Sequence, residues 1–135
     1  MTAIATTAPR TTSTRSLLGT GLVATAAAAV ATPVVAAAGH AAGISLDIGG
    51  MPIPLLGFVN LTVFFSLIGL VVAVVLARVA RHPRRTWIRT TVVLTALSLV
   101  PDVLVDAAVT TQLLLMVTHL VAAAIVIPAV ARRLA

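Results

Sequence analysis

Four long apolar segments follow one another along the chain, and polar, basic or helix-breaking residues separate them. A helix needs about 20 apolar residues to cross the roughly 30 Å hydrocarbon layer of a membrane, and each segment has about that length. The pattern therefore predicts an all-α protein with one membrane domain at 16–133, preceded by a Thr-rich tail at 1–15. We expect the spans at about 16–39, 55–77, 87–109 and 113–131.

The first apolar segment has a second interpretation. Arg10 and Arg15 precede it and Ala36-Ala37-Ala38 lies near its end, as in a secretory signal with a small-residue cleavage site. The apolar run is nevertheless longer than the ~7–15 residues of a usual signal core. We expect a retained span, with cleavage as the alternative.

Composition supports a membrane location. Hydrophobic residues make up 60% of the chain, charged residues 9%, and the mean hydropathy is +1.17. A soluble domain of this size needs more polar surface. With 135 residues, four spans leave no room for a separate soluble domain.

The basic residues predict the orientation. All nine are arginines, and they lie in the tail, at 78–89 or at the C-terminus. By the positive-inside rule, the chain forms an antiparallel up-down four-helix bundle in the plasma membrane with both termini cytoplasmic. We expect anionic lipid headgroups to contact the arginine-rich loop at 78–89. We also expect Trp87 to lie at the membrane–water interface. Without stacking aromatics, the basic excess does not favour nucleic-acid binding. The predicted topology residues are Arg78, Arg81, Arg84, Arg85, Arg89, Arg132 and Arg133.

Ionisable residues interrupt the last two spans. In a hairpin that turns between Thr110 and Thr111, Asp102 and His119 stand level, each about 12 Å deep. Placing an ionisable side chain in lipid costs free energy, so such residues usually pair with a polar partner or serve a function. Residues of the first two spans reach a similar depth. The predicted polar layer, opening outward, comprises Thr32, Asn60, Ser98, Asp102 and His119.

Two further patterns bear on this layer. Polar residues at 91, 95, 98, 102 and 106 recur every three or four positions, which predicts one polar helix face directed into the bundle. Proline removes a backbone donor and bends a helix, and Pro101 should free the carbonyl of Leu97. The predicted kinks are at Pro33, Pro101 and Pro128.

These residues leave two functions open. Asp102 and His119 are either a structural pair that fixes helix register or part of a site for protons or a small solute. Catalytic motifs such as H-E-x-x-H and G-x-S-x-G do not occur, and we expect no enzyme, metal or cofactor. The preferred function is an accessory or interaction role, with a second copy or another membrane protein as partner. The alternative is a small-solute or proton-coupled transporter.

The C-terminal half carries a resemblance. The stretches R-H-P-R-R-T-W, A-L-S-L-V-P-D and M-V-T-H-L-V-A-A-A-I-V-I-P-A-V-A-R resemble an actinobacterial family of small four-span membrane proteins of unknown function. The resemblance is clearest over 55–133, and its pattern includes Ser98, Pro101, His119 and Pro128. It implies a four-helix membrane protein and no particular activity. Small multidrug transporters share the size, but their essential carboxylate lies in the first span, where this chain has no acid.

Overall fold

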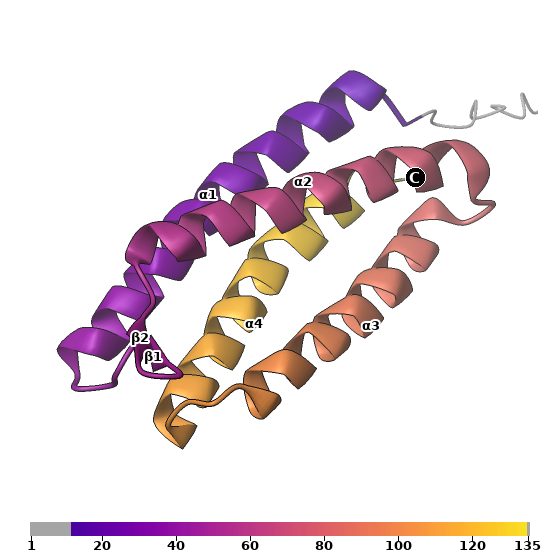
Figure 1. The fold of residues 1–135 in the computed structure, drawn as a ribbon. Coiled ribbons are helices and arrows are strands. Elements are labelled where there is room, and N and C mark those ends of the chain that lie inside the picture. The colour runs from indigo at the N-terminus through magenta and orange to yellow at the C-terminus, as the bar shows by residue number, and fades with distance from the viewer. Residues whose placement is uncertain (1–11, 135) are drawn as a thin grey trace, which may run out of the picture.

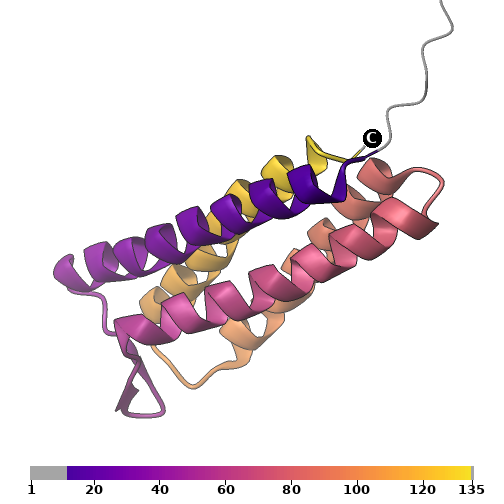
Figure 2. The same ribbon diagram turned by 90° about the horizontal axis from the view of Figure 1, so that it is seen from above.

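The computed structural model describes residues 12–134, which form four long helices and a short β-hairpin. Successive helices run in opposite directions, and the C-terminal end lies at the same end of the bundle as the start of α1 (Figures 1 and 2). All four helices are long and apolar enough to cross a membrane, as predicted. The elements are α1 (Thr14–Ala41), β1 (Asp47–Ile48), β2 (Met51–Pro52), α2 (Leu55–Val79), α3 (Pro83–Leu104) and α4 (Val109–Ala131).

The start of α1 differs from the prediction. Residues 1–11 of the expected tail lie outside the described residues, but the helix already begins at Thr14. Ser13 caps it, because the Ser13 hydroxyl accepts a hydrogen bond from the Ser16 backbone N–H at 3.5 Å. The polar tail therefore supplies the cap and first turn of the first apolar helix.

The break between α3 and α4 also differs. The prediction placed it at 110–112, whereas α3 ends at Leu104 and the non-helical linker 105–108 leads into α4. Gln112 explains the shift, since its Nε2 donates to the carbonyls of Val105 at 2.9 Å and Val103 at 3.2 Å. The last carbonyls of a helix lack intrahelical donors. The polar residues taken for a turn thus form the first turn of α4, and one of them caps α3.

Helix α1 packs against both α2 and α4, and it carries more buried residues than any other described helix. Two glycines allow the close approach. A methyl group at Gly21 would overlap the side chain of Leu70 on α2, and one at Gly39 would overlap Leu114 on α4. Small residues bring membrane helices close enough for extensive van der Waals contact. The close packing of α1 against α2 and α4 therefore depends on glycine, which has no side chain, at positions 21 and 39.

The loop between α1 and α2 closes the end of the bundle opposite the start of α1 and the end of α4. Its hairpin turns at Gly49 and Gly50, both with positive φ, as a two-residue hairpin turn requires. The Gly49 N–H donates to the Asp106 carbonyl at 2.8 Å, and the Thr111 hydroxyl donates to the Ser45 carbonyl at 2.6 Å. Leu46 packs into a core cluster with Phe58 and Leu114. The loop is thus docked on the α3–α4 linker.

Candidate functional site

Asp102 and His119 meet across the interface between α3 and α4. The distance from His119 Nδ1 to Asp102 Oδ2 is 2.8 Å. The two side chains differ in exposure: that of Asp102 is 9% exposed and that of His119 is 41% exposed. The pair therefore consists of a buried carboxyl group and an imidazole with one side accessible to its surroundings.

Asp102 and His119 lie at the same height in the bundle, although the connection between α3 and α4 is not where the sequence predicted it. His119 lies ten residues after the start of α4, about 15 Å along the helix axis. Asp102 lies only two residues before the end of α3. The linker 105–108 connects the two helix ends; it bends at 105–107, where the Ala107 N–H donates to the Val105 carbonyl at 2.9 Å. The two residues that the sequence placed opposite each other thus do meet, although α3 is shorter than predicted and a non-helical linker joins it to α4.

Hydrogen-bond geometry indicates which ring nitrogen of His119 carries a hydrogen. His119 Nδ1 also lies 3.0 Å from the Leu115 carbonyl oxygen, one turn earlier on α4. The Leu115 carbonyl oxygen can only accept, so this hydrogen bond requires a hydrogen on Nδ1. The N–H satisfies hydrogen-bond geometry toward Leu115, whereas Asp102 Oδ2 is close to Nδ1 but has no aligned donor within the described part of the chain. The contact with Asp102 is therefore mainly electrostatic.

The other predicted members of the polar layer lie elsewhere. Thr32 of α1 is buried, and its Oγ1 lies 2.8 Å from that of Thr62 on α2. Asn60 is exposed, and the structure does not bring it to Thr32. The two positions on α2 are two residues apart and face different directions. Thr62 was missed as a site residue; the signal that could have found it is its helical spacing of seven and eleven from the small residues Gly69 and Ala73.

Ser98 is also separate from the pair. Its hydroxyl donates to the Thr95 carbonyl at 2.7 Å within α3, and not to the Leu97 carbonyl that Pro101 should free. Of the predicted polar stripe, Thr91 and Asp102 are buried and the two residues between them are partly buried. Asp106 lies beyond the helix and is exposed. The inward polar face thus exists on α3, but it forms local hydrogen bonds apart from Asp102.

The three predicted kink prolines lie inside helices: Pro33 in α1, Pro101 in α3 and Pro128 in α4. Pro101 occupies the last turn of α3, where its carbonyl accepts from the Val105 N–H at 2.9 Å. It therefore lies where the helix ends, and not in the middle of a long span.

Trp87, which the sequence predicts at the membrane–water interface, is buried inside the bundle. It is 1% exposed, and its indole N–H donates to the Ile127 carbonyl at 3.1 Å. It lies near the end of the bundle that carries the arginines, but it points inward and joins α3 to α4. The seven predicted topology arginines are all exposed: Arg78, Arg81, Arg84, Arg85, Arg89, Arg132 and Arg133.

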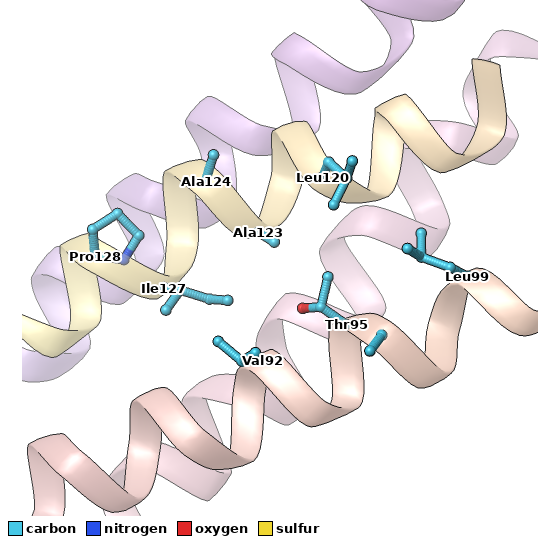
Figure 3. A pocket seen from close by; sticks show the side chains of 9 residues that line it. Val92, Thr95, Leu99, Leu120, Ala123, Ala124, Ile127 and Pro128 are labelled. Carbon is cyan, nitrogen blue, oxygen red and sulfur yellow. The ribbon is translucent and has the colours of Figure 1, made fainter. Parts of the chain in front are cut away.

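Between these two attachment points, α3 and α4 leave an open apolar crevice of about 460 Å³. Side chains from both helices point into it, and the Thr95 hydroxyl is the polar group among those drawn (Figure 3). Binding sites for small molecules usually have volumes of about 300–1,000 Å³ and mostly apolar walls. The lining residues are Val92, Thr95, Ala96, Leu99, Leu120, Ala123, Ala124, Ile127 and Pro128.

Within residues 12–134, no group of three or more histidine and acidic side chains comes together as metal ligation would require. The Asp102–His119 pair supplies two potential ligands and no third. What the pair offers chemically is a buried negative charge or proton acceptor beside an accessible imidazole.

Comparison with known proteins gives a family but no activity. Searches of curated proteins and of solved structures returned no significant match. A family of unknown function, DUF6069, matches residues 12–135, which include all four helices and both members of the pair. The chain therefore belongs to the family of unknown function DUF6069, as a protein with four helices able to span a membrane.

Proposed function

We propose that this protein is a non-enzymatic, multi-pass protein of the plasma membrane with an accessory or interaction role, in which the Asp102–His119 pair locks α3 onto α4. The observation that carries the proposal is the 2.8 Å contact between two residues of different helices, one of them buried. In lipid, polar contacts between helices replace the hydrophobic effect as a source of specific packing.

The distribution of charge supports an orientation with both termini in the cytoplasm. The α2–α3 connection and the C-terminal end of α4 lie at the same end of the bundle as the start of α1 (Figure 1). That end carries Arg15 and the seven topology arginines, whereas Asp47 and Asp106 lie at the opposite end. Positive charge is retained on the cytoplasmic side during insertion.

Burial of α1 supports its retention as a span. Leu17 and Ala28 are fully buried, and Thr32 is 2% exposed. A cleaved signal would leave the facing surfaces of α2 and α4 without this partner. The four-helix bundle is therefore the functional unit in this proposal.

For an accessory role, the available surface determines where a partner protein would bind. The connections are short: residues 80–82 between α2 and α3 and 105–108 between α3 and α4. In contrast, α2 exposes large apolar side chains, including Phe64 at 59% and Phe65 at 62%. A partner would therefore meet this protein mainly within the plane of the membrane, as a second copy or another membrane protein.

A transporter is the second candidate, and one observation favours it. Asp102 Oδ2 is buried with no aligned donor among the described residues, next to the accessible ring of His119. Intramembrane carboxyl and imidazole groups serve as proton relays in transporters. An exchangeable proton or a small cation on Asp102 would satisfy this oxygen.

Asp102→Asn separates the two candidates, with Asp106→Asn as the matched control because Asp106 is exposed and outside the helix. For a structural lock, Asp102→Asn lowers resistance to unfolding, and neither variant nor wild type shows pH-driven flux in proteoliposomes. For a transporter, wild type and Asp106→Asn show flux, and Asp102→Asn folds but loses it. The latter result would overturn the accessory role.

Orientation is tested separately. The chain contains no cysteine, so Ser45→Cys and His82→Cys each introduce a single reporter at opposite ends of the bundle. A membrane-impermeant maleimide added to intact cells should label the cysteine at position 45 and spare the one at 82. The reverse pattern would contradict the proposed orientation.

A further inference from the structure

On the side nearer the arginine-bearing end of the bundle, the lining of the open crevice ends at Val92 of α3 and Pro128 of α4. On α3, Arg89 lies seven residues before the crevice residue Ala96, and Arg132, the C-cap of α4, lies four residues after Pro128. Spacings of seven and four keep residues on one helix face. Both arginines and both crevice residues are exposed, so the cations flank the open side of the apolar crevice.

These arginines have no anionic partner in the described structure. Across residues 12–134, the contact between His119 and Asp102 is the one pairing of a basic with an acidic side chain within 4 Å. An exposed guanidinium at a membrane surface is well suited to bind phosphate, to which it can donate two parallel hydrogen bonds. The crevice thus combines apolar walls with unpaired positive charge at its mouth.

We propose that the crevice binds one anionic glycerophospholipid, with the phosphate at Arg89 and Arg132 and an acyl chain between α3 and α4. Arg89 precedes Leu99 by ten residues, or about 15 Å along the helix. That depth is half of the roughly 30 Å hydrocarbon layer, so the crevice matches one leaflet. Charge at the mouth and depth together favour a lipid over a second protein chain.

The two attachments of α3 explain why space remains for the chain. Trp87 joins α3 to Ile127 at the basic end, and Asp102 joins it to His119 at the other. No residue of α3 between Thr91 and Asp102 is buried. An acyl chain there would fill the gap between the helices and bury the apolar walls.

Trp87 provides the readout, because it is the single tryptophan of the chain and its indole contacts the carbonyl of the crevice residue Ile127. At 1% exposure, its ring makes almost no direct contact with the lipid that surrounds the bundle. The experiment titrates the full chain in detergent micelles with phosphatidylglycerol brominated on its acyl chains. Phosphatidylcholine with identical brominated chains is the headgroup control.

The expected result is saturable quenching of Trp87 by the anionic lipid, with at least about tenfold weaker quenching by the zwitterionic one. Arg89→Gln combined with Arg132→Gln should weaken binding of the anionic lipid at least about tenfold. Arg78→Gln combined with Arg81→Gln removes the same charge from exposed positions away from the crevice and should leave binding unchanged.

Filling the crevice tests the acyl-chain site. Ala124→Phe adds bulk at an exposed position of the crevice wall, and Ala27→Phe adds it at an exposed position on α1. The first should abolish quenching, and the second should leave it intact. Ala96→Leu repeats the test from the facing wall. Equal quenching by both lipids, an equal effect of the two arginine pairs, or full quenching in Ala124→Phe would each overturn the proposal. The proposal rests on membrane residence, which cysteine labelling tests independently.

Discussion

The contact between α1 and α2 at Gly21 can be tested by a single methyl group. In a helix, Gly→Ala gains about 1 kcal/mol of intrinsic propensity. At Gly21, however, the new methyl group would overlap the side chain of Leu70, which is itself 5% exposed and has little room to move. Overpacking of this kind costs about 1–3 kcal/mol. We therefore expect Gly21→Ala to lower the free energy of unfolding by up to about 2 kcal/mol.

Gly19 is the matched control, because it lies on the same helix and a methyl group there would meet no atom within 4 Å. Gly19→Ala should leave stability unchanged or raise it by up to about 1 kcal/mol. The assay is reversible unfolding in mixed micelles titrated with a denaturing detergent. The expected difference between the two variants is about 1–3 kcal/mol. Agreement between them within about 0.3 kcal/mol would refute the close approach of α1 and α2.

Three further contacts give predictions in the same assay. A double-mutant cycle of Asp102→Asn and His119→Gln should give a coupling energy between about 0.6 kcal/mol, the average for polar contacts between membrane helices, and about 1.7 kcal/mol, their maximum; additive effects would argue against a direct contact. Trp87→Phe keeps the ring but removes the donor to the Ile127 carbonyl, and should lower the free energy of unfolding by about 1 kcal/mol; an unchanged value would mean that this hydrogen bond does not stabilise the bundle. Gln112→Met keeps the side-chain length but leaves the Val103 and Val105 carbonyls without their donor, so we expect a loss of about 1 kcal/mol and faster backbone hydrogen exchange at the end of α3.

The four helices were predictable because their signal is long and redundant. Each span contributes about 20 apolar residues, and shifting its ends by several positions does not remove it. The Asp102–His119 contact was predictable for a related reason: the two helices are adjacent in the chain and antiparallel, so depth from the turn relates their positions. The pair forms although the turn was misplaced: α3 ends at Leu104, α4 begins at Val109, and the linker 105–108 joins them.

The other features of the structure depend on helix rotation and packing, which the pattern of hydrophobic and polar residues does not determine. The choice of Thr62 over Asn60 as the partner of Thr32 requires the rotation of α2 about its axis, and packing sets that rotation. The burial of Trp87 among side chains of other helices likewise depends on the rotation of α3, which residue type and position in the chain do not give. The crevice follows from the separation of α3 and α4 between two attachment points, which three-dimensional packing determines.

The contact between α3 and α4 is tested most directly by solid-state NMR on the protein in lipid bilayers. A nitrogen–carbon correlation experiment reports whether Nδ1 of His119 lies close to the carboxyl carbon of Asp102. The chain has three histidines and three acidic residues, so single substitutions suffice to assign both signals. The 2.8 Å separation of Nδ1 and Oδ2 predicts a correlation between them. Both signals resolved without a correlation would show that the two helices are not joined there.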